Sequence, residues 1–140
     1  MKDLTWEQIK QKEPGTILHD AYTNGIRFII LRGPSALCAY VGVPLSHPLA
    51  SFHYDDIPLE CHGGLTFSGE GDKWRPKDFY WYGWDYGHAG DWCFFDKQCG
   101  SSSKQWLVGD VIQDSEGVLF EFKTLVELSE KITNKVKERK

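Results

Sequence analysis

Polar and apolar residues alternate loosely over residues 16–22, and residues 26–31 are rich in β-branched and aromatic side chains. Asn24-Gly25 stands between these runs, and this dipeptide is the strongest signal for a two-residue hairpin turn. The pattern therefore predicts a β-hairpin. Residues 36–43 are almost continuously apolar, which is typical of a central strand that is buried on both faces.

Residues 78–84 predict another strand, with an unusual density of aromatic rings. Because successive side chains of a strand point to opposite faces, these residues divide into two rows. We expect one row in the core. The other row has three interpretations: a platform for a planar ligand, a contact with another subunit, or the inner side of a helix-covered sheet. The rows are Phe79, Trp81 and Gly83, and Tyr80, Tyr82 and Trp84.

The N-terminal region carries a capping-box pattern, in which a hydroxyl residue is followed three places later by a residue that can bond back. Thr5 and Gln8 have this spacing. They predict a short helix from Trp6 to about Lys12, which Pro14-Gly15 would end.

A second capping-box pattern, formed by Thr124 and Glu127, predicts the start of a C-terminal helix. Apolar residues then recur at helical spacing, with lysines in the last turns. We expect this apolar stripe to pack on the sheet or on a neighbouring subunit. It consists of Leu125, Leu128, Ile132 and Val136.

The remaining segments have weaker patterns. Taken together, the predicted strands and helices indicate an α+β fold. We expect a single domain over residues 1–140, mainly an antiparallel sheet with a short N-terminal helix and a longer C-terminal helix. The weaker predictions are an irregular segment at 44–58, a short strand at 64–67, a mobile polar loop at 69–77, a linker at 98–104, a strand or helix at 106–112 and a strand at 117–122.

Size and charge restrict the class of protein. A chain of 140 residues fits one domain with one sizeable core. The longest apolar run, residues 28–31, is far too short to cross a bilayer, and the first residues lack the apolar core of a signal peptide. We expect a cytosolic protein without a membrane partner. A net charge of −4 argues against DNA or RNA as a partner, although a local cationic cluster can still hold a small anion.

The four cysteines do not have the close-paired spacing of zinc sites. In a reducing cytosol we interpret Cys38, Cys61, Cys93 and Cys99 as small core residues or inert thiols. A metal or redox role is the alternative.

Residues 61–92 hold most of the candidate chemistry. Gly63 and Gly64 can let backbone N–H groups approach an anion, and the hydroxyls of Thr66 and Ser68 would add donors. The segment lacks the Lys-Ser/Thr ending of a P-loop. The alternative interpretation is a bend or bulge where two strands pack closely.

A second candidate group combines His62 with Asp85, His88 and Asp91. Three interpretations remain open: a polar cluster that holds a ligand, a metal or acid–base site, and a structural hydrogen-bond network. No helical HExxH frame accompanies these residues.

Aromatic and cationic side chains nearby suit a nucleotide. Trp74 and Tyr82 offer flat faces, and the guanidinium of Arg75 can bind phosphate with two hydrogen bonds. The alternative is that the rings fill the core. No Ser-His-Asp or Cys-His arrangement is recognisable, so we assign no catalytic residue, metal ligand or cofactor.

Two motifs resemble a widespread family of small bacteriophage proteins. These proteins carry an HGGLT(F/Y)S element followed by a (G)(F/W)DxxHxGD element. Here the first corresponds to residues 62–68 and the second to residues 83–91, and the resemblance covers roughly residues 36–92. Small phage proteins of this kind often counter host defence, in some cases by sequestering nucleotide-derived immune signals in oligomeric pockets.

The resemblance and the residues together predict a binding protein without turnover. It would act in the cytoplasm of the infected bacterial host, form a homo-oligomer and sequester a small nucleotide-like immune signal. One alternative is a metal-dependent hydrolase of such a signal, and another is an inhibitor that binds a host defence protein. All three require that the two glycine-rich polar segments meet in the fold.

Overall fold

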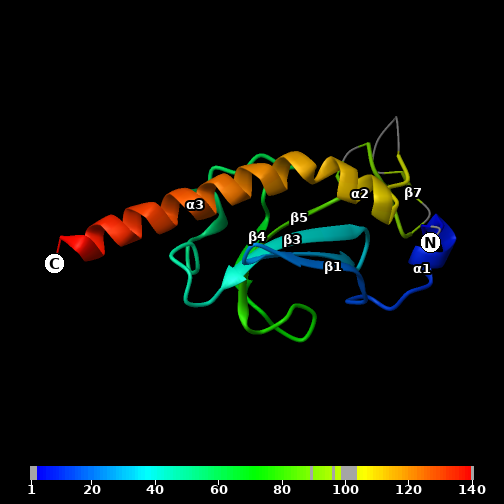
Figure 1. Ribbon diagram of the computed structural model, residues 1–140. Coiled ribbons are helices and arrows are strands. Elements are labelled where there is room, and N and C mark those ends of the chain that lie inside the picture. Colours follow the sequence, from blue (N-terminus) through cyan, green and yellow to red (C-terminus); the bar gives the residue numbers. More distant parts are fainter. Residues whose placement is uncertain (1–2, 89, 96, 99–103, 140) are drawn as a thin grey trace.

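The computed structural model describes residues 3–88, 90–95, 97–98 and 104–139. A five-stranded sheet with the order β1-β2-β3-β5-β4 forms its centre, and every neighbouring pair is antiparallel. Figure 1 shows helix α3 crossing one face of this sheet. The α+β prediction is confirmed. The strands are β1 (Ile17–Thr23), β2 (Ile26–Arg32), β3 (Leu37–Pro44), β4 (Phe67–Glu70) and β5 (Phe79–Asp85).

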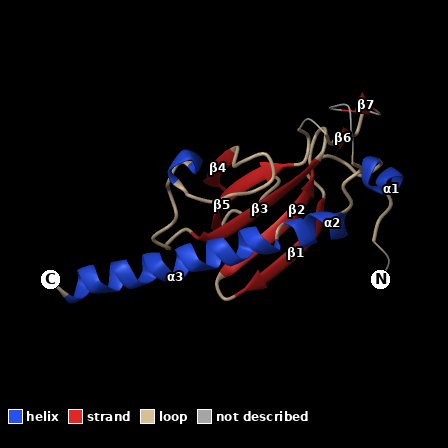
Figure 2. Ribbon diagram, turned by 90° about the horizontal axis from the view of Figure 1, so that it is seen from above, coloured by secondary structure: helices blue, strands red, loops and turns tan. Residues whose placement is uncertain are grey.

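The helices lie before and after the sheet in the sequence. Figure 2 shows α2 and α3 on the same side of the strands, with the far end of α3 extending beyond them. No helix in the described part of the chain is long and apolar enough to span a membrane. The remaining elements are α1 (Trp6–Lys10), the 3₁₀ turn η1 (Tyr54–Asp56), α2 (Val108–Asp114), α3 (Glu116–Glu138) and a small ladder of β6 (Trp92–Cys93) and β7 (Lys97–Gln98).

The predicted hairpin is confirmed as β1 and β2. Asn24 and Gly25 have φ values of 54° and 78°, so both adopt the left-handed conformation that a type I′ turn requires. The turn brings Thr23 opposite Ile26 and sets the register of the two strands. The buried central strand is confirmed as β3, which lies between β2 and β5.

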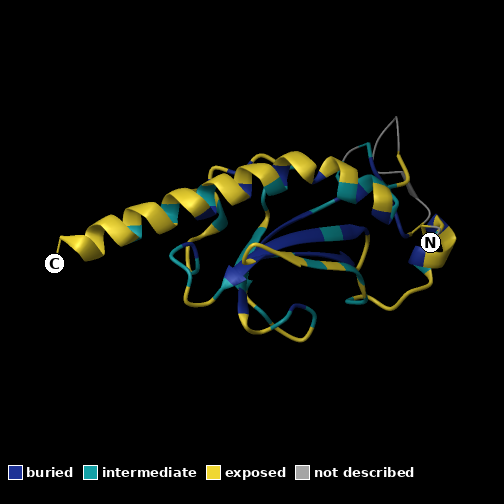
Figure 3. Ribbon diagram, in the orientation of Figure 1, coloured by how far each residue is buried: buried dark blue, intermediate teal, exposed yellow. Residues whose placement is uncertain are grey.

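Both faces of the strands β2, β3 and β5 are buried, by different elements on each side. The face toward α2 and α3 holds the larger core cluster, to which Tyr82 and Trp84 contribute. The opposite face holds a smaller cluster that includes Phe79 and Trp81, with Trp74 of the β4–β5 loop packed against it. Figure 3 shows the burial concentrated in the strands. For Tyr82 and Trp84 the helix-covered interpretation is therefore the correct one.

The prediction of a strand at 117–122 is wrong, because these residues belong to α3. Val118, Phe122 and Val126 are buried and recur every four residues, which is a helical period. The β-branched and aromatic composition of the segment suggested a strand. Thr124 is not a cap either: it lies in the middle of α3, where its hydroxyl donates to the Phe120 carbonyl.

Other boundaries differ by a few residues. The capping box of Thr5 and Gln8 is confirmed, but α1 ends at Lys10. The strand expected at 64–67 is β4, which begins at Phe67 and takes in the first residues of the expected polar loop. Of the segment 106–112, the part from Val108 onward is helical and begins α2. Most of the expected linker at 98–104, including Cys99, lies outside the described residues.

Candidate functional site

The two glycine-rich segments meet at one end of the sheet, as expected. The first forms a turn in which the N–H of Gly64 donates to the carbonyl of Cys61 at 3.0 Å. Gly63 occupies the third position of this turn with a φ of 70°, which is typical of glycine in a type II turn. The turn presents the His62 ring toward the second segment, which follows β5.

His62 is held by an acid and by two aromatic rings. Its Nε2 lies 2.7 Å from Oδ2 of Asp91. Its ring stacks on Tyr86 at 4.6 Å between centroids and meets the edge of Trp106 at 4.9 Å. The side chain keeps 24% of its surface exposed, so the imidazole is fixed in orientation and still reachable from solvent.

Asp91 holds the two segments together. Its carboxylate accepts hydrogen bonds from His62, from the backbone N–H of His88 at 3.0 Å and from the indole of Trp106 at 2.7 Å. The side chain is only 4% exposed. Since three donors already occupy this buried carboxylate, Asp91 positions the site and is not free to contact a ligand.

His88 forms a second pair of imidazole and carboxylate. Its Nε2 lies 3.2 Å from Oδ1 of Asp85, an oxygen that also accepts the N–H of Gly87. The Nε2 atom is buried and, among the described residues, has no hydrogen bond of acceptable geometry, so the close contact is an ion pair only when the ring is protonated. The ring lies against Gly63, and its centroid is 6.0 Å from that of His62.

Tyr86, on which the His62 ring stacks, is itself held in place by hydrogen bonds. Its buried hydroxyl accepts from the Trp84 indole at 3.0 Å and donates to Asp114 of α2 at 2.8 Å. Burial raises the pKa of this phenol, so it remains a neutral hydrogen-bonding group at physiological pH. These hydrogen bonds connect Tyr86 to both β5 and α2.

A polar hollow of about 200 Å³ adjoins Trp106. The Nζ of Lys104 lies 4.1 Å from the centre of the Trp106 ring. The backbone of Lys104 pairs with Gly90 and Trp92 on either side of Asp91, which fixes this lysine beside the site. The hollow is lined by Lys104, Trp106, Asp110, Gln113 and Asp114.

The structure does not bring Trp74, Arg75 and Tyr82 to this site. Arg75 is buried on the opposite face of the sheet, where it bonds the Tyr40 hydroxyl and Asp72. Trp74 packs closely over Gly15. Tyr82 is fully buried, and its hydroxyl donates to the Leu49 carbonyl. All three have structural partners that account for them.

The predicted hydroxyl donors also have separate positions. Ser68 accepts the backbone N–H of Tyr54 and so secures η1. Thr66 is exposed, with its N–H donating to the Gly83 carbonyl at the edge of β5. Gly64 has a φ of 83° and open space above its α-carbon, so an approaching group can reach the turn there.

Sequence reasoning missed Lys104, Trp106 and Tyr86. Tyr86 lies inside the second motif, so an aromatic residue between Asp85 and His88 was an available signal. No local pattern marks Trp106, because it is far from His62 in the sequence and only the fold brings the two rings together.

Among the described residues, no group of three or more His, Cys, Asp or Glu side chains is arranged to hold a metal ion. Asp91 instead bonds the imidazole of His62 and the backbone N–H of His88, and Asp85 accepts the backbone N–H of Gly87. The donor set as it stands therefore fits an orienting role for Asp85 and Asp91.

The chain has no significant match to any family model, curated protein or solved structure. The family resemblance of the two motifs therefore stays a prediction.

Proposed function

We propose that the protein binds a small anionic, nucleotide-like ligand at His62 and His88 and releases it unchanged. The observation that carries this proposal is the pair of partly exposed imidazoles, 6.0 Å apart, each beside its own carboxylate. A carboxylate partner fixes the orientation of an imidazole ring, and an imidazole N–H can donate a hydrogen bond to an anion.

The two sides of the imidazole pair suit different parts of a nucleotide. The turn leaves open space above the α-carbon of Gly64, where a phosphate can approach. The hollow beyond Trp106 contains the carboxylates of Asp110 and Asp114. Because carboxylates repel phosphate and accept N–H donors, that side suits an amino-bearing base stacked near the indole ring.

The wider role follows from the motif resemblance. A phage protein with such a site would sequester a nucleotide-derived immune signal in the cytoplasm of the infected bacterium. Sequestration needs tight binding but no reaction, and the buried Asp91 supports it, because its carboxylate already accepts three hydrogen bonds inside the fold.

A second candidate function is hydrolysis of the same signal. An imidazole beside a carboxylate is also the usual arrangement for general acid–base catalysis, and His88 with Asp85 has it. A metal-dependent version would require an ion to recruit these side chains, which metal analysis of the purified protein tests directly.

Incubation with a panel of cyclic nucleotides and ADP-ribose derivatives tests both candidates. Binding is followed by calorimetry, and heat-released ligand is identified by mass spectrometry. We expect intact ligand, and a loss of affinity of roughly tenfold or more for His62→Ala or His88→Ala, which corresponds to one charge-assisted hydrogen bond.

His53→Ala is the matched control, since His53 is exposed in the η1 loop, where its ring stacks on Tyr54 and accepts the N–H of Asp55. This variant should bind normally. Recovery of a chemically altered ligand would replace sequestration by catalysis. Absence of binding to every compound, or equal loss in the control, would reject the proposed site.

A further inference from the structure

The far half of α3 carries an apolar surface that the domain itself does not cover. Leu128, Ile132 and Val136 are 52%, 56% and 51% exposed, and Figures 1 and 2 show this part of the helix beyond the sheet. With Leu125 they form the α3 stripe, which spans about 80° of the helix surface at 3.6 residues per turn. The stripe continues from the buried row of Val118, Phe122 and Val126, and its first residue, Leu125, is half-buried against the same core cluster.

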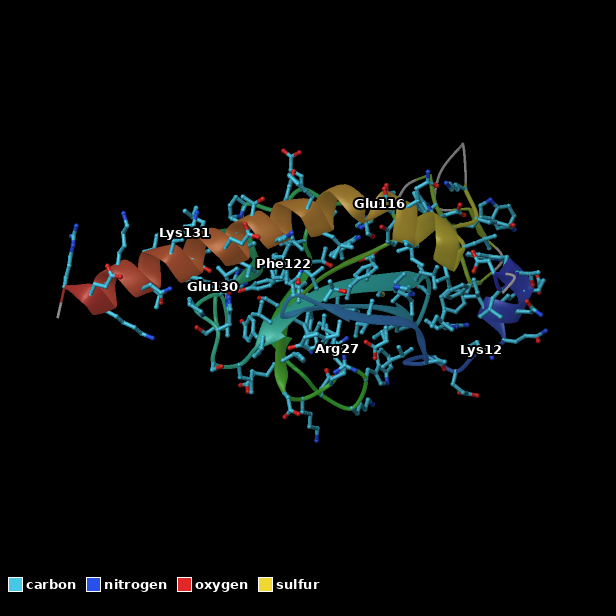
Figure 4. All side chains as sticks on the ribbon, in the orientation of Figure 1. Lys12, Arg27, Glu116, Phe122, Glu130 and Lys131 are labelled. Carbon is cyan, nitrogen blue, oxygen red and sulfur yellow. The ribbon has the colours of Figure 1, made fainter. Side chains whose placement is uncertain are left out.

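The charge on α3 changes sign along its length. Residues 116–130 contain four glutamates and one lysine, a net charge of −3. Residues 131–139 contain four basic residues and one glutamate, a net charge of +3. The sign changes between Glu130 and Lys131, and Figure 4 shows both farther along the helix than Phe122.

We propose that the α3 stripe binds the α3 stripe of a second copy of this chain in antiparallel orientation. Antiparallel pairing places the acidic half of each helix beside the basic half of the other, whereas parallel pairing would place like charges together. A twofold axis at the level of Glu130 sets Leu128 opposite Ile132 of the second copy. In the same register, Glu121 faces Arg139 of the second copy.

A hollow at the start of the stripe fits the end of the partner helix. It measures about 440 Å³ and includes Glu60 and Glu121 among its lining residues. Oε2 of Glu121 accepts the Glu60 N–H at 3.3 Å. The antiparallel register delivers Lys135 and Arg139 of the second copy to this acidic hollow, while Pro58, Phe120 and Leu125 supply apolar walls.

Sedimentation velocity of the full chain without ligand, from about 1 to 200 µM, tests the proposal. We expect a concentration-dependent dimer, which Ile132→Glu should abolish. Asn134→Glu is the matched control, because it adds the same charge one half-turn away, off the stripe. Circular dichroism should show unchanged helix content in both variants, since both positions are exposed.

A second comparison tests the orientation. Arg139→Glu should weaken the dimer roughly tenfold, since it replaces two attractive pairs by two repulsive pairs. Lys123→Glu makes the same charge change off the stripe and should have no effect. The double variant Glu121→Lys with Arg139→Glu should recover most of the lost affinity.

Several outcomes would overturn the proposal. A wild-type chain that stays monomeric at all concentrations rejects it, and so does a dimer that survives Ile132→Glu. An undiminished dimer in Arg139→Glu rejects the antiparallel register. Binding of a monomeric chain to anionic lipid vesicles through the stripe would assign the stripe to a membrane surface instead. None of these outcomes depends on the proposed ligand site.

Discussion

At the scale of single residues, the contact between Gly63 and His88 joins the two halves of the candidate site. A Cβ at Gly63 would lie 2.3 Å from the His88 ring, and its φ of 70° is unfavourable for other residues. We expect Gly63→Ala to lower the free energy of unfolding by about 2–4 kcal/mol, from backbone strain and overpacking together. Urea denaturation measures this loss.

Gly64→Ala separates the two causes. Gly64 also has a positive φ, of 83°, but a Cβ there would meet nothing within 4 Å. This variant should therefore lose only about 1–2 kcal/mol, the cost of backbone strain. Equal losses in the two variants would show that the His88 contact is unimportant.

The thiols of Cys38 and Cys61 should be poor nucleophiles in the folded protein. Burial raises the pKa of Cys38 to about 11 and that of Cys61 to about 12. At pH 8 only about one Cys38 in a thousand is then a thiolate, the reactive form. Alkylation mapped by peptide mass should be slow at both sites and should accelerate as the pH rises toward 11.

The same chain in urea is the control for the thiols, and there both cysteines should react at the rate of ordinary free thiols. Fast alkylation of native Cys38 at pH 8 would contradict the expected protection and revive the redox interpretation.

At the scale of elements, α3 divides into a half that holds the fold together and a half that extends beyond it. Phe122 is fully buried and packs on Tyr82 at 6.1 Å between ring centroids. We expect Phe122→Ala to cost about 3–5 kcal/mol of stability, the usual range for a buried ring. Leu128→Ala, measured by denaturation at a concentration low enough to keep the chain monomeric, should cost less than about 0.5 kcal/mol.

A large loss of stability in monomeric Leu128→Ala would mean that the far half of α3 packs against the domain. The stripe would then not be available to a second copy.

At the scale of the whole molecule, the two core clusters lie on opposite faces of the same sheet. We therefore expect the protein to unfold in a single step. Ile29→Ala weakens the smaller cluster, and Phe122→Ala weakens the larger one. Both variants should shift the same transition, with tryptophan fluorescence and far-UV circular dichroism coinciding. Two separate transitions in either variant would show that the two faces are stabilised independently.

Much of the sheet follows from local sequence. The Asn24-Gly25 turn, the apolar run of β3 and the alternating rings of β5 each determine their structure within a few residues. The segment at 117–122 was mispredicted because its residues favour a strand by composition. In the helix that this segment forms, Phe122 packs against Tyr82. Tertiary contacts therefore outweighed the local preference for a strand.

The site was predictable only in part. The two motifs identified His62, His88, Asp85 and Asp91 as a group, and the structure brings them together. The same reasoning joined Trp74 and Arg75 to them because they are close in sequence. The path of the β4–β5 loop places those two on the other face of the sheet.

The sequence by itself determined the elements that depend on near neighbours: the hairpin, the capping of α1, the buried strands and the amphipathic C-terminal helix. Only the tertiary structure decided that Asp91 is an internal anchor, that Trp106 borders His62 and that the α3 stripe extends beyond the domain. These features join residues far apart along the chain. The hydrogen-bond partners of a side chain and its exposure depend on residues that the fold brings within a few ångströms. A local sequence pattern does not contain this information.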